Sequence, residues 1–196
     1  MIYSWKAPVK SRAFGYIKNV EIKESNIRAI EVVAYHEAGH AIACFVLKEK
    51  FTKISIKSFG ELAGRVDGST DTVEPFELND MQKYDPDRRR NITQVFLAGG
   101  VAEIMLYEMK LKGWGWELTQ ELKNSIDESA NGHSKDDIAH VLKLVGITGG
   151  NITGYIAHTR TLLEEHRQSL DALAGALQER RELSGEEAAG IIKANL

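Results

Sequence analysis

Two histidines four residues apart, with a glutamate next to the first, are the part of this sequence best suited to chemistry. His36, Glu37 and His40 form an H-E-x-x-H pattern in a stretch whose apolar residues recur at helical spacing. Positions i and i+4 of a helix share a face, so both imidazoles could bind one Zn²⁺ ion. Glu37 would then lie beside a water molecule held by the metal. A histidine pair also occurs on helices without metal, so the pattern by itself leaves that alternative open.

Small residues surround this histidine pair. Ala34, Ala38, Gly39 and Ala41 would let the helix pack closely against a neighbouring element. A glycine inside a helix costs about 1 kcal/mol relative to alanine, which indicates a packing or functional reason for Gly39. Cys44 is the only cysteine, and we expect a small core residue rather than a zinc ligand there. The absence of a cysteine pair excludes a disulfide framework and makes a reducing, cytoplasmic location the default prediction.

Length and composition fit a single globular domain with an ordinary core. The chain has 196 residues, of which 43% are hydrophobic and 27% charged. Its formal net charge of −3 argues against nucleic acid as the main partner, because phosphate binding favours a basic surface. We expect no membrane span, and the N-terminus lacks the uninterrupted apolar run of a secretory signal.

The elements expected around the histidine pair are mainly helical. An irregular lead-in at residues 1–24 precedes a single domain at 25–196. Apolar spacing and capping patterns predict helices at about 25–48, 87–110, 118–126, 134–144, 152–182 and after Ser184. Alternating apolar residues predict a strand at 51–57, followed by a short strand at 62–66 that would form a hairpin-like sheet with it. The predicted fold is therefore mainly α (α+β), with one small β-sheet.

A catalytic zinc site needs three protein ligands and an open position for water. Two histidines on one helix leave the third ligand to a later segment. The candidates are acidic or histidine side chains, namely Glu103, Glu108, His133, Asp136, Asp137 and His140.

Several segments in the same order resemble the FtsH-type zinc metallopeptidases. They are Ala34–Ile42, similar to the signature helix; Thr52–Ile56 with Ala63-Gly64, similar to the strand pair; Leu97–Glu103, similar to the second helix motif; and Gly132–Ile138, similar to the third. The resemblance covers roughly residues 25–196. It implies a helical zinc-peptidase domain with one small sheet.

The resemblance also implies a third ligand. In that family it is an aspartate at the start of a helix after a Gly-rich turn, which corresponds to Asp137, with Asp136 as the alternative. The competing interpretation is that Ser134 and Asp137 form a capping box that only starts the helix. Glu103 lies in the second motif and would either orient a histidine ligand or be a charge on the helix surface. As a ligand itself, Glu103 would give a thermolysin-like set.

The activity implied is that of a zinc-dependent endopeptidase with Glu37 as general base. An extended peptide substrate would add to the edge strand, or this strand would only close the sheet. The residues of that strand are Leu62, Ala63, Gly64, Arg65 and Val66. The segment with Trp114 and Trp116 is an insertion relative to the family. These side chains would either gate the substrate cleft or only pack against the rest of the domain.

The sequence contains no Gly-x-x-x-x-Gly-Lys-Ser/Thr phosphate loop. We therefore expect a stand-alone domain without the family's ATPase module and membrane anchor. Such a domain would cleave flexible peptides or unfolded proteins, or work with a separate ATPase unfoldase. The alternative function is a non-catalytic zinc-binding regulatory or interaction module of the same fold.

Overall fold

The computed structural model describes residues 29–57, 85–113, 134–148 and 151–196, with a few residues between 115 and 127. Its elements are α1 (Ala29–Val46), β1 (Lys53–Ser55), α2 (Pro86–Gly113), α4 (Lys135–Thr148), α5 (Ile152–Glu165), α6 (Arg167–Arg180), β2 (Glu182–Ser184) and α7 (Gly185–Ala194). The described residues contain one two-stranded sheet. The predicted mainly α (α+β) class is confirmed.

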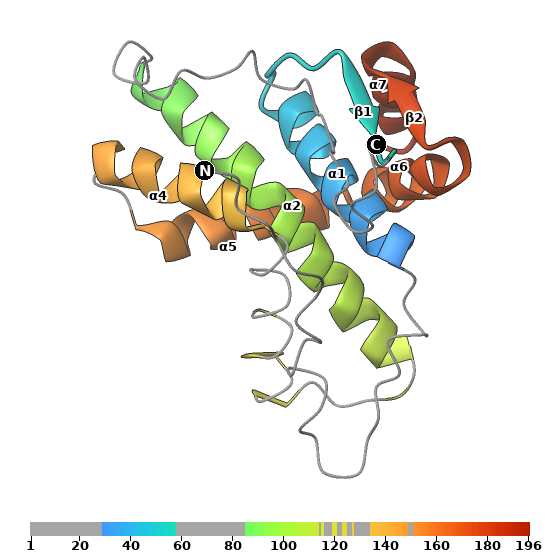
Figure 1. The fold of residues 1–196 in the computed structure, drawn as a ribbon, viewed down its shortest axis with the longest axis horizontal. Coiled ribbons are helices and arrows are strands. Elements are labelled where there is room, and N and C mark those ends of the chain that lie inside the picture. The colour runs from blue at the N-terminus through green and yellow to red at the C-terminus, as the bar shows by residue number, and fades with distance from the viewer. Residues whose placement is uncertain are drawn as a thin grey trace, which may run out of the picture.

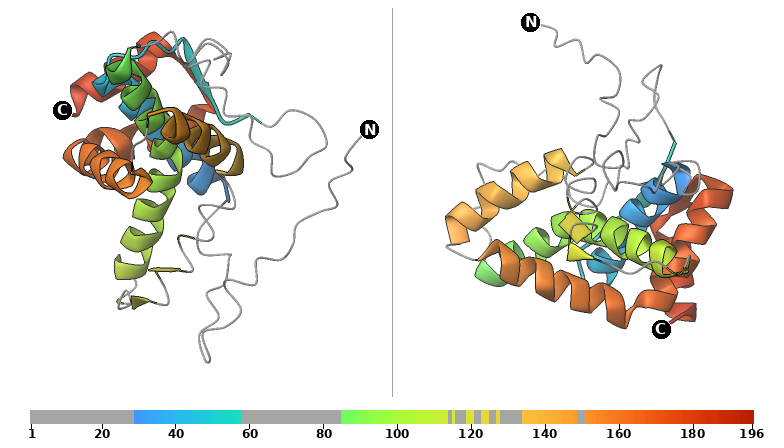
Figure 2. Two further views of the ribbon diagram at one scale, coloured as in Figure 1. Left: turned by 90° about the vertical axis from the view of Figure 1, so that its left-hand side faces the viewer. Right: turned by 90° about the horizontal axis from the view of Figure 1, so that it is seen from below.

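Helices α1 and α2 pack against each other at the centre of the molecule. In Figure 1, α4 and α5 lie on one side of α2, while α6, α7 and the sheet lie beyond α1. The view from below in Figure 2 shows α5 running alongside α2, and the two helices are in contact. The C-terminal part of α2 extends past the other helices.

Small side chains allow α1 and α2 to approach closely. A Cβ added at Gly39 would lie 2.4 Å from the Ala98 carbonyl oxygen and 2.8 Å from the Ala102 Cβ. Ala38 and Ala41 on α1 are completely buried. The packing reason predicted for Gly39 is confirmed, because any larger residue would force the two helices apart.

Helix α2 is more apolar than the sequence prediction allowed. It is the one described helix that is long and apolar enough to cross a membrane, contrary to the expectation that no such segment exists. However, 67% of its most apolar 18-residue window is buried inside the protein. We therefore interpret α2 as a core helix, and its apolar character as the result of contacts with helices on several sides.

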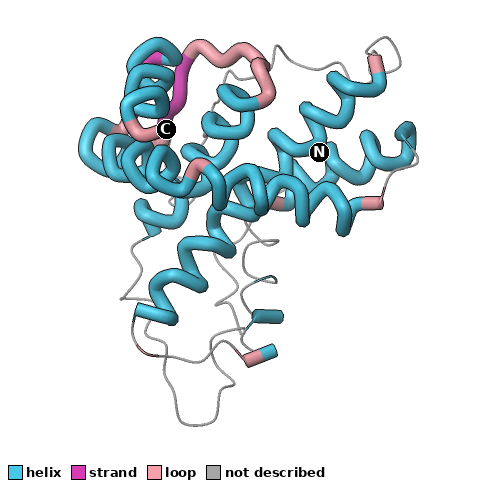
Figure 3. Tube along the Cα trace, turned by 180° about the vertical axis from the view of Figure 1, so that it is seen from behind, coloured by secondary structure: helices cyan, strands magenta, loops and turns pink. Residues whose placement is uncertain are grey.

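The partner of β1 comes from the far end of the chain. β1 pairs antiparallel with β2, with Ile54 opposite Leu183. Figure 3 shows the two strands against the C-terminal helices. The sequence prediction missed β2 and placed residue 182 in a helix, which was wrong. The strand predicted at 62–66 lies outside the described residues, as do the lead-in at 1–24 and most of the helix expected at 118–126.

The single helix predicted at 152–182 is two helices. It breaks at His166, whose backbone (φ −110°, ψ 29°) is not helical, and α6 ends at Arg181 in the left-handed region (φ 66°). Helix α4 continues through Gly146 to Thr148, past the predicted end. The capping box predicted at the start of the last helix is confirmed, with Ser184 and Glu187 bonding each other's backbone N–H.

Candidate metal centre

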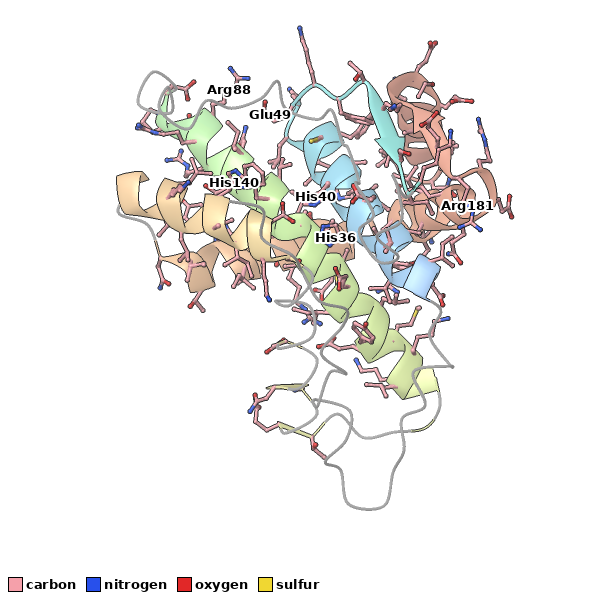
Figure 4. The ribbon with its side chains drawn as sticks, viewed as in Figure 1. His36, His40, Glu49, Arg88, His140 and Arg181 are labelled. Carbon is pink, nitrogen blue, oxygen red and sulfur yellow. The ribbon has the colours of Figure 1, made fainter. Side chains whose placement is uncertain are left out.

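Three predicted ligand residues from two different helices meet at one point. The Nε2 atoms of His36 and His40 are 3.0 Å apart, and Oδ2 of Asp137 lies 3.3 Å from the first and 3.5 Å from the second. Figure 4 shows both histidines between α1 and α2. Within the described part of the chain, this is the one group of three such side chains that could hold a metal ion.

The spacing of these atoms fits a zinc ion. A tetrahedral ion with bonds of about 2.0–2.1 Å separates its ligand atoms by about 3.3–3.4 Å. The three distances here span 3.0 to 3.5 Å. Two imidazoles and a carboxylate also match the three-ligand type of zinc site, which keeps a fourth position for water or substrate. The donor set therefore matches the catalytic type of zinc site more closely than the structural type, which has four protein ligands.

The other nitrogen of each ring is held by α2. His36 Nδ1 donates to Oε1 of Glu103 at 2.6 Å, and His40 Nδ1 donates to the backbone oxygen of Val95 at 2.7 Å. Because both partners are acceptors, the hydrogen of each neutral ring must lie on Nδ1, which leaves the Nε2 lone pair for the metal. Glu103 is only 1% exposed. It is therefore not a surface charge, and it contacts the side of His36 that faces away from Asp137.

The capping-box alternative for the start of α4 does not describe this structure. The buried Ser134 Oγ has no hydrogen-bond partner among the described residues. The Asp137 carboxylate instead points to the two imidazoles. The side chain of Asp136, the other candidate, lies outside the described set.

Charge coupling within the cluster changes the proton affinity of all three groups. Burial lowers the pKa of His36, but hydrogen bonds to Asp137 and Glu103 outweigh it and raise the pKa to about 10. Burial likewise opposes protonation of His40, and Asp137 again raises its pKa above the usual value. Burial would raise the pKa of Asp137, yet the two rings hold it well below normal. The metal-free cluster thus carries protons that a divalent cation would replace.

Glu37 presents an acceptor atom that nothing in the fold satisfies. The residue is 4% exposed, and its buried Oε2 has no hydrogen-bond partner among the described residues. Burial raises the pKa of this carboxyl despite the nearby histidines. An unpaired buried acceptor is costly, so its retention beside His36 indicates a use for it.

The three ligand side chains differ in how far they are exposed. The exposed fraction of the side chains rises from 5% for His40 to 14% for His36 and 22% for Asp137. Among the three ligand side chains, the one at the start of α4 is therefore the most exposed.

Other candidate ligands lie elsewhere. Glu108 forms a salt bridge with Arg160, 3.2 Å from Nη1 to Oε1. His140 stacks on Phe96 with ring centroids 4.9 Å apart. His133, Trp114, Trp116 and the predicted substrate strand Leu62–Val66 lie outside the described side chains.

Two contributors to the site were not predicted from the sequence. One is the carbonyl of Val95, which carries no sequence signal because every residue has one. The other is Gly99, whose missing Cβ would lie 2.6 Å from atoms of both imidazoles. The run of small residues Ala98-Gly99-Gly100 within a helix of large apolar residues is the signal that could have identified it.

Comparison with known proteins agrees with the resemblance at a coarse level. No family model matches the chain. The ATP-dependent zinc metalloprotease FtsH of Marinobacter nauticus is 28% identical over 191 residues, covering 83% of this chain and 29% of that protein. The chain thus spans less than a third of that relative's length. Over most of its own length, this protein is similar to part of an FtsH zinc metalloprotease.

Proposed function

We propose that this protein is a zinc-dependent endopeptidase that hydrolyses peptide bonds in flexible or unfolded polypeptides. The observation that carries the proposal is the meeting of His36, His40 and Asp137 at zinc-ligand spacing, beside the unpaired carboxylate oxygen of Glu37. A purely structural zinc site has no use for such an acceptor. Similarity to a zinc metalloprotease supports the same conclusion.

The residues of the site have distinct tasks in this reaction. His36, His40 and Asp137 would hold the ion, and Glu103 and the Val95 carbonyl fix the two rings. When bound, Zn²⁺ lowers the pKa of water toward 7 and polarises the scissile carbonyl. Glu37 takes a proton from the attacking water and gives it to the leaving amine. Its raised pKa suits both steps, because the carboxyl must accept the proton and later release it.

Loose polypeptide is the substrate class that we propose. The relative is named as ATP-dependent, whereas the 196 residues here contain no phosphate-binding loop. Segments that are already unfolded would fit the site directly, and folded proteins would first have to be unfolded by an ATPase. The strand Leu62–Val66 remains our candidate for binding the peptide backbone.

The test is a single substitution of the base. Glu37→Gln keeps the shape of the side chain but cannot accept the proton, so hydrolysis of an unfolded casein substrate should fall about 100- to 10,000-fold. Zinc content, measured by atomic emission, should stay at the wild-type level. Glu165→Gln on the exposed part of α5 is the matched control and should cleave normally.

Two results would contradict the proposal. Undiminished turnover by the Glu37→Gln variant would refute the assigned base. A zinc-loaded wild-type protein that cleaves neither casein nor a random peptide library would favour the non-catalytic binding module instead.

A further inference from the structure

We propose that Gly99 is a positioning residue of the metal centre, because its missing side chain leaves the space in which both imidazoles direct Nε2 to one ion. The inference rests on the metal centre of the proposed function. Val95, Gly99 and Glu103 lie one turn apart on the same face of α2. Val95 and Glu103 bind the two Nδ1 atoms, and Gly99 lies between them. These three residues form a cradle for the histidine pair.

The contact at the middle of this cradle excludes any side chain. A Cβ at Gly99 would lie 2.6 Å from Cε1 and Nε2 of His36 and 2.6 Å from Nε2 of His40. Carbon atoms do not approach ring atoms below about 3.0 Å, so a methyl group could be accommodated only if both rings moved. The atoms it would displace are the two nitrogens that would bind the ion.

Neither a rotation of the rings nor a separation of α1 and α2 could make space for this methyl group without the loss of other contacts. Rotating a ring would break its 2.6 or 2.7 Å hydrogen bond to Glu103 or Val95 on α2, and with it the orientation of the Nε2 atom. Separating α1 from α2 would undo the close packing of Gly39 on Ala98. Alanine at position 99 would therefore disturb the ligand geometry rather than be absorbed elsewhere.

The neighbouring glycine offers a matched control. Among the described residues, a Cβ at Gly100 would meet only Ser134, with Oγ at 3.0 Å and Cβ at 3.6 Å. That hydroxyl has no hydrogen-bond partner among the described residues and can rotate away. Gly100→Ala thus makes the same chemical change, one residue further along the same helix, without touching either imidazole.

The experiment compares zinc binding by the wild type, Gly99→Ala and Gly100→Ala, using chelator competition. We expect Gly99→Ala to lose at least 100-fold in zinc affinity and Gly100→Ala to stay within a few-fold of wild type. Co²⁺ substitution adds a readout of ligand geometry, because the visible absorption of a tetrahedral site should weaken in Gly99→Ala alone. Wild-type zinc affinity and an unchanged Co²⁺ spectrum in Gly99→Ala would overturn the inference.

If Gly99→Ala does not fold, the same substitution can be tested in a double variant that lacks both imidazoles, His36→Ala with His40→Ala. If the added methyl group clashes with the rings, this double variant must tolerate it. In that double variant, adding Gly99→Ala should raise the melting temperature, because alanine favours a helix more than glycine does. A fall in melting temperature there would place the obstacle outside the histidine rings and overturn the inference.

These outcomes separate the inference from the proposed activity. A wild type that binds zinc without cleaving peptides refutes the peptidase and leaves the role of Gly99 to be decided by the variants. A Gly99→Ala protein that binds zinc normally refutes the role of Gly99 and leaves the peptidase intact. A wild type that binds no zinc refutes both.

Discussion

Each histidine of the centre is fixed by a different kind of acceptor. His36 is held by the buried carboxylate of Glu103, and His40 by the backbone carbonyl of Val95. A carboxylate partner makes an imidazole a more basic ligand and keeps its orientation, whereas a carbonyl mainly fixes orientation. The hydrogen bond that orients His36 can therefore be changed by substituting Glu103. The one that orients His40 cannot be removed in this way, because every residue at position 95 has a backbone carbonyl.

Replacing Glu103 by glutamine should weaken zinc binding without removing a ligand. The amide oxygen can still accept the hydrogen bond from His36, but the negative charge is lost. We expect zinc affinity to fall about 10- to 100-fold, measured by chelator competition. Glu165→Gln serves again as the control. A variant that binds zinc as tightly as wild type would show that Glu103 does not act on the metal through His36.

Zinc binding should release protons, and the affinity should rise with pH. The pKa of His36 is raised to about 10 in the metal-free cluster, so the ring is protonated at pH 7 and must lose that proton to bind the ion. Raising the pH toward 10 removes this competition, and lowering it strengthens the competition. Calorimetry at pH 7 in buffers of different ionisation enthalpy measures the number released. A value of zero would contradict the proton-loaded cluster.

The ligand residues differ in how far the sequence could identify them. The pair His36 and His40 follows from helical spacing alone. Asp137 was predicted from the resemblance, because its local pattern with Ser134 fits a helix cap equally well. The structure distinguishes the two geometrically, since the carboxylate faces the rings. Its role as a zinc ligand stays a prediction until a metal is bound and measured.

At the scale of elements, the contact between α1 and α2 sets the distance between the two histidines and the acceptors that orient them. Gly39→Ala places a methyl group against the Ala98 carbonyl. We expect a loss of about 1–3 kcal/mol in the free energy of unfolding, measured by urea denaturation. Zinc affinity should fall as well, because the rings on α1 and their acceptors on α2 move apart.

Gly175→Ala on α6 is the contrasting case. No atom of the described part of the chain lies within 4 Å of a Cβ at that position. The substitution should therefore stabilise the protein, by up to about 1 kcal/mol. Equal effects at positions 39 and 175 would show that helix propensity, rather than the close approach of α1 and α2, decides the outcome at Gly39.

Local patterns predicted the helices better than their ends or the sheet. The amphipathic stretches and the Ser184–Glu187 capping box act within a few residues, so they are visible in the sequence. The pairing of Ile54 with Leu183 joins segments about 130 residues apart and leaves no local trace. The break at His166 could not be predicted either, because the helical spacing of apolar residues continues without interruption from α5 into α6.

For the molecule as a whole, the ion would connect two helices, α1 and α4, which each pack against α2 and α5. His36 and His40 lie on α1, and Asp137 lies on α4, on the other side of α2 in Figure 1. Zinc at 100 times its dissociation constant should stabilise the fold by about 2.7 kcal/mol. The check is the melting temperature, which should rise with zinc and fall with a chelator. In Asp137→Asn the zinc-dependent rise should be much smaller, and an equal rise would exclude Asp137 as a ligand.

The distant origin of β2 has a consequence for synthesis on the ribosome. Strand β1 follows directly after the histidine helix, but its partner is made only at residues 182–184. Helix α6, which packs on α1, likewise lies far behind it in the sequence. The part of the apolar surface of α1 that α6 covers must therefore stay uncovered while the intervening helices are made. The nascent chain can close α1 against α2 early, but it completes this side of the core only once residues 167–184 have emerged.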